Sequence, residues 1–310
     1  MGYKPELLVP AGSLAEIRAY LEAGADAVLI GETRYGMRLP GNIQANEVAQ
    51  AVRLGHDHGA KVYVSVNKLL HNDQLKELQD YVKVLAEAGI DGIQFGDPAV
   101  LQAVRELAPQ IALHWNAEMT STNYSTANYW GSKGATRAVL ARELNMDEIT
   151  EMQPHLQVEA EVQVHGMTNI YHSKRRLVQS YMMHQGRPVE GGDLGKERGL
   201  FLIEAERKEE KFPIYEDDNG THIMSSDDIC ILEDLHILLA ASVASFKIET
   251  LLKSPEYNKV VIQAYRKTID AYIADPDQYE MDEAWIESIR RVQDPERELS
   301  FGFFYKEQVY

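Results

Sequence analysis

The chain has 310 residues, 45% of them hydrophobic and 25% charged, and its formal net charge is −17. This length allows one large α/β domain or two ordinary ones, and the acidic balance excludes a surface that attracts nucleic acid as a whole. A single cysteine, Cys230, excludes an internal disulfide and a cluster or zinc site built from this chain's own thiolates. No stretch has the roughly 18 apolar residues of a membrane span. The N-terminus lacks a signal peptide, so we expect a cytoplasmic protein with no membrane partner.

Strands and helices alternate along the chain. Ser13 to Glu16 form a capping box that opens the first helix, directly after an apolar strand. Glycines at 24, 59, 89 and 134 each end a helix just before a strand, so one helix-to-strand joint recurs. This alternation requires parallel strands with right-handed crossovers. The predicted strands are 6–11, 26–31, 61–67, 92–96, 111–117, 137–143, 159–166 and 245–250.

Eight such units predict a closed α/β barrel of the (βα)8, TIM-barrel-like class over residues 1–275. An open doubly wound sheet is the competing fold, but no Gly-x-Gly-x-x-Gly follows the first strand and no Walker loop occurs. The polar stretch of about 167–225 predicts a long insertion between strands 7 and 8, lying over the barrel mouth. Within it, Asp217-Asp-Asn-Gly220 is a hairpin-turn signal. Residues 276–310 predict a C-terminal helix and an aromatic tail.

Polar side chains occupy one face of otherwise apolar strands. In the seventh strand, Glu161 and His165 alternate with Val162 and Val164. Inside a parallel sheet covered by helices, such groups must meet each other or a ligand, because a buried unpaired charge is costly. Barrel active sites lie at the C-terminal ends of the strands. The residues collected at those ends are Asn67, Asn116, Glu118, Arg142, Glu143, His165, Lys247 and Glu249.

This set suits an anionic ligand beside groups that transfer protons. We expect Glu161 and His165 to be catalytic, and the cations Lys247 and Arg142 to bind the anion. The remaining predicted ligand-binding residues are Asn67, Asn116, Glu143 and Glu249. For any single residue the alternative is a structural ion pair, such as Lys247 with Glu249. No metal is predicted, since Glu161 and His165 stand without a second His/Asp cluster.

Several segments carry a resemblance to a known family: Glu6-Leu-Leu-Val-Pro-Ala-Gly-Ser13, Gly24-Ala-Asp-Ala-Val28, Ala141-Arg-Glu-Leu144, Glu161-Val-Gln-Val-His-Gly166 and Lys247-Ile-Glu249 followed by Lys253-Ser-Pro-Glu-Tyr257. In order, from residue 6 to about 270, they resemble the collagenase-like peptidase family, peptidase family U32. The resemblance implies a barrel-like fold. The family name implies proteolysis, yet several members are tRNA-modification or quinone-biosynthesis proteins. Those that hydroxylate the wobble uridine of tRNA use prephenate, and related members hold an iron–sulfur cluster on four Cys.

The chain departs from the family at the cluster. The four cysteine positions hold Asn169, Arg176, Phe201 and Ala205. The chain therefore resembles the short, cysteine-poor paralogue that accompanies a longer cysteine-bearing one in some bacteria. This resemblance implies that the chain alone binds no cluster, that the longer paralogue is its partner, that tRNA is reached through the complex, and that prephenate serves as a co-substrate of the pathway.

Three functions compete. The chain is expected to act as a subunit in prephenate-dependent 5-hydroxylation of the wobble uridine. Its net charge of −17 opposes unaided RNA binding and calls for a cation-bearing partner. The first alternative is a collagenase-like peptidase, which needs an activated nucleophile or a metal-bound water. Cys230 follows Ser225–Asp228 at a predicted helix start, a position that lowers the pKa of a thiol. It does not end a strand, however, as a barrel active-site residue would. No Gly-x-Ser-x-Gly elbow occurs that would mark a nucleophilic serine. The second alternative is a non-catalytic scaffold subunit.

Overall fold

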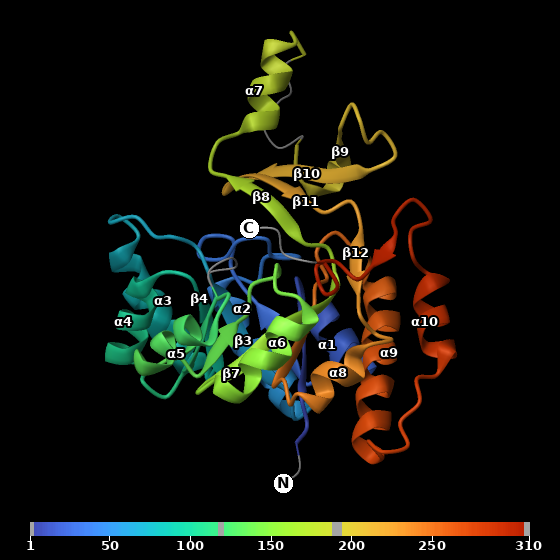
Figure 1. Ribbon diagram of the computed structural model, residues 1–310. Coiled ribbons are helices and arrows are strands. Elements are labelled where there is room, and N and C mark those ends of the chain that lie inside the picture. The colour runs from blue at the N-terminus through green and yellow to red at the C-terminus, as the bar shows by residue number, and fades with distance from the viewer. Residues whose placement is uncertain (1–2, 117–120, 188–193, 307–310) are drawn as a thin grey trace.

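Eight parallel strands close into a barrel in the computed structural model, which describes residues 3–116, 121–187 and 194–306 (Figure 1). β13, the last barrel strand, pairs with both β1 and β7, so the sheet closes on itself between the first and last barrel strands. The predicted TIM-barrel-like fold is confirmed, and the open sheet is excluded. The barrel strands are β1 (Glu6–Pro10), β2 (Ala27–Ile30), β3 (Lys61–Val66), β4 (Gly92–Phe95), β5 (Ala112–Trp115), β6 (Arg137–Val139), β7 (Glu159–Gly166) and β13 (Ser245–Ile248).

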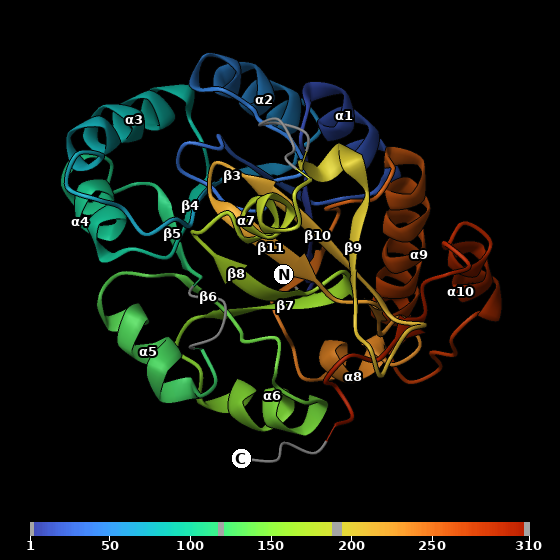
Figure 2. The ribbon, with the colours of Figure 1, turned by 90° about the horizontal axis from the view of Figure 1, so that it is seen from above.

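Helices surround the barrel (Figure 2). They bury the apolar stripe that their sequences predict; in α3, Leu78, Val82 and Leu85 face the core. The glycines at 24, 59, 89 and 134 all have positive φ, which accounts for the recurring helix-to-strand joint. The helices of the ring are α1 (Leu14–Ala23), α2 (Ala45–Asp57), α3 (Leu75–Ala88), α4 (Pro98–Leu107), α5 (Tyr124–Ser132), α6 (Met146–Met152) with η1 (Gln153–His155), α8 (Leu235–Ala240) and α9 (Pro255–Ala274).

A second, antiparallel sheet lies across the barrel mouth, in the stretch between β7 and β13 (Figures 1 and 2). Its strand order is β8-β11-β10-β9, and Asp217 pairs with Gly220 at the predicted hairpin turn. Its elements are β8 (Asn169–Ser173), α7 (Leu177–His184), η2 (Lys196–Arg198), β9 (Leu200–Ile203), β10 (Lys211–Asp217) and β11 (Gly220–Met224). This small sheet therefore covers the barrel mouth, and it follows directly after β7 in the chain.

The chain returns to the barrel through β12 (Asp228–Cys230), which pairs antiparallel with β7 and parallel with β14 (Leu299–Ser300). The predicted helix start at Cys230 is wrong, because the residue lies in this strand, where burial raises the pKa of its thiol to about 11. α10 (Glu283–Arg290) packs on α9 before the tail. Within the described residues, no helix is long and apolar enough to cross a membrane.

Candidate functional site

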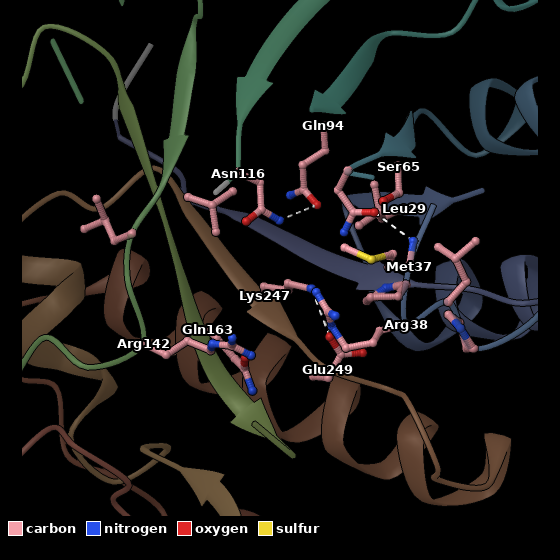
Figure 3. A pocket seen from close by; sticks show the side chains of 16 residues that line it. Leu29, Met37, Arg38, Ser65, Gln94, Asn116, Arg142, Gln163, Lys247 and Glu249 are labelled. Atoms are coloured by element: carbon pink, nitrogen blue, oxygen red, sulfur yellow. Dashed lines mark hydrogen bonds and ion pairs between the residues drawn. The ribbon is translucent and has the colours of Figure 1, made fainter. Parts of the chain in front are cut away.

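A polar pocket opens at the carboxyl ends of the barrel strands, beneath the small sheet. It brings together Asn67, Asn116, Arg142, Lys247 and Glu249, which the ends of four different strands supply. The end of each parallel strand points to the same side of a barrel, so residues far apart in sequence converge there. Figure 3 shows Lys247 directed toward Glu249 and Asn116 toward Gln94. The polar lining residues are Arg38, Ser65, Asn67, Gln94, Asn116, Arg142, Gln163, Lys247 and Glu249.

The pocket is cationic although the whole chain is acidic. Three cations, Arg38, Arg142 and Lys247, line it beside the carboxylate of Glu249, which lies 2.9 Å from the Lys247 ammonium. Burial and repulsion by the Arg142 guanidinium lower the pKa of Arg38 to about 10, and burial lowers the pKa of Arg142. Both guanidinium groups remain charged at neutral pH. This crowding of like charges favours a bound anion.

The loop that carries Arg38 was not predicted as part of the site. Arg38 adopts a left-handed φ of 53°, which is uncommon for a residue with a side chain and leaves no sequence signature. Two contacts hold the loop over the pocket. The Asn67 side-chain oxygen accepts a hydrogen bond from Met37 N at 2.8 Å, and Lys196 Nζ of the small sheet's η2 donates to Leu39 O at 2.6 Å. The insertion thereby helps to position a pocket cation.

Glu161 lies in the layer below the pocket. Its Oε1 accepts a hydrogen bond from Gln94 Nε2 at 3.0 Å, and Gln94 Oε1 accepts one from Asn116 Nδ2 at 3.0 Å. Burial raises the pKa of Glu161, against the attraction of Arg137 and Lys247. The carboxyl group therefore reaches the pocket through the amide of Gln94 and does not line it. Its predicted catalytic role remains a prediction.

The prediction that His165 faces the pocket is wrong. Lys247 pairs with Gln163, but the next residue, Ile248, pairs with His165, so Val164 is an extra residue in β7. Such a β-bulge reverses the alternation of side chains. His165 therefore joins the outward face, where its Nε2 lies 2.9 Å from the Tyr257 hydroxyl of α9 and the ring is fully buried.

Other predicted residues stand apart from the pocket. Glu143 does not line it, although its charge acts on neighbouring Arg142. Glu118 lies outside the described residues.

Ser65, Gln94 and Gln163 were missed as site residues, yet each is a polar residue on an inward-facing position of an apolar strand. The alternation used for β5 and β7 would have found them. Among the described residues, no three His, Cys, Asp or Glu side chains gather as metal ligands would.

A closed barrel with a polar pocket at its strand ends defines a TIM-barrel-type protein. Residues 12–309 match the family model of Peptidase family U32. The chain belongs to peptidase family U32, as its sequence motifs indicate.

Three relatives show how near the chain lies to particular members. It is 51% identical over 308 residues to tRNA hydroxylation protein P2 of Bacillus subtilis, covering 99% of both chains. It is 32% identical to tRNA hydroxylation protein P1 of the same organism, covering 99% of this chain and 74% of that one. It is also 32% identical to tRNA hydroxylation protein P of Escherichia coli, covering 86% of this chain and 68% of the relative.

Proposed function

We propose that this chain is a cytoplasmic subunit in prephenate-dependent 5-hydroxylation of the wobble uridine in tRNA. It acts with a longer, cysteine-bearing paralogue, and tRNA is bound by the complex. The relatives named for tRNA hydroxylation, one of them similar along 99% of its own length, support this pathway. The observation that carries the proposal is the cation-rich pocket at the barrel mouth.

Prephenate is a dicarboxylate, and the pocket cations are chemically suited to carboxylate groups, although the enclosed space of about 60 Å³ has to widen to admit the whole molecule. The guanidinium groups of Arg38 and Arg142 offer planar pairs of donors that match carboxylate geometry, while Lys247 is a point charge on a flexible stem. Asn116 and Gln94 add amide groups that fix the orientation of a polar ligand. Glu249 forms an ion pair with Lys247, and Arg38 and Arg142 place two further cations at the same pocket.

The chain's own side chains do not fit an iron–sulfur cluster. A four-cysteine cluster needs thiolates, whereas the corresponding positions hold Asn169, Arg176, Phe201 and Ala205. The remaining thiol, Cys230, is buried behind β7, and its pKa is raised to about 11. Adding an oxygen atom to uridine requires an oxidant. These facts support assignment of the redox step to the cysteine-bearing partner, with ligand binding left to this chain.

Proteolysis has less support at this site. No histidine or cysteine lines the pocket among the described residues, and His165 points away from it. Ser65, which lines the pocket, therefore has no histidine beside it to serve as the base of a Ser–His pair. A scaffold subunit is the other alternative, and it does not account for three cations gathered at the strand ends, where the active sites of barrels lie.

The test is a deletion strain that keeps the cysteine-bearing partner but lacks any other paralogue of overlapping function. We expect the 5-hydroxyuridine-derived nucleosides of its total tRNA, measured by mass spectrometry, to fall when this gene is removed. Wild-type protein should restore them. The pocket variant Lys247→Met should restore them poorly, and Lys83→Met, which removes an exposed lysine from α3, should restore them fully. Unchanged wobble nucleosides in the deletion strain would end the proposal.

A further inference from the structure

The small sheet has an apolar outer face that faces away from the barrel. On its other face, Tyr215, His222 and His172 stack in a row. Residues on the outer face pair across three strands, Leu200 with Ile214 and Ile214 with Ile223. Together with one flank of α7 they line an open apolar groove. We call this surface the α7–β9 face, and it consists of Leu177, Tyr181, Leu200, Leu202, Ile214 and Ile223.

Helix α7 has no core to fold on. It has the sequence Leu-Val-Gln-Ser-Tyr-Met-Met-His, yet none of its eight residues is buried, and Tyr181 is 61% exposed. A helix this short is marginal in water, and most helical stability comes from burying an apolar side. Figure 1 shows α7 standing away from the barrel, above the small sheet. The helix therefore leaves its apolar side chains accessible to a partner.

Strand β9 shows the same feature at the sheet edge. It pairs with β10 on one side and with no other strand among the residues that the structure describes. Its sequence Leu-Phe-Leu-Ile carries no charge or proline, and Phe201, Leu202 and Ile203 are exposed although they point to alternate faces. Soluble proteins normally protect an edge strand with charge, proline or a cover. An apolar edge exposed on both faces is suited to pairing with another chain.

The chemistry of this surface selects a protein as its occupant. Arg198 is the charged residue among the described residues that line the groove. RNA binding depends on neutralising phosphates, for which this surface has too few cations. A contiguous apolar patch on a soluble protein marks a protein interface.

We infer that the α7–β9 face binds the cysteine-bearing paralogue, and that a strand of the paralogue extends the small sheet at β9. This inference rests on the proposed function for the identity of the partner. Two observations favour the paralogue over a second copy. Two copies would each bring a net charge of −17, which opposes their association. Relatives P2 and P1 occur in one organism under one functional name, and the P1 similarity spans 99% of this chain.

The experiment measures the affinity of this chain for the longer paralogue encoded in the same genome. Wild type should form a one-to-one complex by light scattering. The double variant Tyr181→Glu, Leu202→Lys should weaken the complex at least about tenfold, because aromatic and apolar residues at an interface centre dominate affinity. The control Tyr129→Glu, Val84→Lys changes residues of matched type that are 55% and 38% exposed on α5 and α3. The control should bind like wild type, and both variants should keep the wild-type melting temperature.

Three outcomes would overturn the inference: equal affinity of the double variant, a wild-type homodimer that the double variant abolishes, and lost tRNA binding with an intact protein complex. Failure of the proposed function appears elsewhere, in the wobble nucleosides of the deletion strain. A complex formed through this face, with unchanged nucleosides on deletion, would refute that function and leave the docking surface standing.

Discussion

Lys247 shows how a single ion pair can fit two interpretations. Its 2.9 Å contact with Glu249 is the structural pair that the sequence offered as an alternative to ligand binding. The neighbours distinguish the two. Glu249 also attracts Arg38 and Arg142, so this carboxylate keeps cationic neighbours when Lys247 is removed. In an isolated structural pair, removing the lysine would leave the carboxylate buried without a cation beside it.

Replacing Lys247 should separate binding from folding. We expect Lys247→Met to weaken prephenate binding by about tenfold or more, since a charge-assisted hydrogen bond contributes roughly 1.5–3 kcal/mol. We expect its urea midpoint to stay near wild type, because removing one of three crowded cations also removes repulsion. Calorimetric titration and urea unfolding measure the two quantities, with Lys83→Met as control. Equal losses of affinity and stability would favour the structural ion pair.

His165 should make the fold sensitive to mild acid. Burial lowers the pKa of His165 to about 3, so the folded chain keeps this ring neutral. An unfolded histidine has a pKa near 6.5, so below that pH only the unfolded chain takes up the proton, and stability falls by up to about 1.4 kcal/mol per pH unit. We therefore expect the free energy of unfolding of His165→Gln to fall less steeply than that of wild type between pH 6.5 and 5.

Two features make that measurement specific. Asp228 has a pKa lowered to about 2, so it stays ionised throughout the range and adds no slope. His184→Gln, an exposed change on α7, should keep the wild-type slope. Parallel curves for wild type and His165→Gln would show that the ring is not held neutral.

At the scale of the elements, the end of β7 shapes the pocket. Gly166 has a φ of +98°, and a Cβ there would lie 2.3 Å from Glu249 O. We expect Gly166→Ala to displace the strand end that carries Glu249 and to lower the free energy of unfolding by about 3 kcal/mol or more. Gly89→Ala is the matched control, with a φ of +78° and open space, and should cost about 1–2 kcal/mol. Urea unfolding compares them; equal costs would mean that the contact with Glu249 relaxes freely.

The same strand marks the limit of prediction from sequence. The eight barrel strands were predictable because glycine-capped helices and apolar runs are local signals. The inward residues Asn67, Asn116, Arg142, Lys247 and Glu249 followed from alternation and from the rule for barrel strand ends. His165 could not be placed, since the bulge at Val164 exists only in the register with β13. Arg38 was not predicted as a pocket residue for a similar reason, because the loop that carries it is held by Asn67 and Lys196, which are distant in sequence.

For the whole molecule, the contrast between pocket and surface sets how RNA is approached. The pocket holds three cations, but the chain as a whole carries −17. We expect the chain alone to bind tRNA with a Kd weaker than roughly 10⁻⁵ M at near-physiological salt, since phosphate contacts dominate such affinity. Adding the paralogue should tighten binding by about tenfold or more. Fluorescence anisotropy with labelled tRNA at several salt concentrations tests both; tight binding by the chain alone would contradict the expectation.

The way in which the small sheet joins the barrel has an evolutionary consequence. The chain leaves the barrel at Gly166 and returns at Ile229, and these residues lie opposite each other in an antiparallel strand pair. The two junctions are therefore neighbours, roughly 5 Å apart. Because its two junctions are neighbours, the small sheet can be lost, exchanged or enlarged in one genetic event without altering the closure of the eight strands. A chain with residues 168–227 replaced by Asn-Gly should still fold as a barrel, and an ancestral member of the family could have acquired its partner surface in a single insertion.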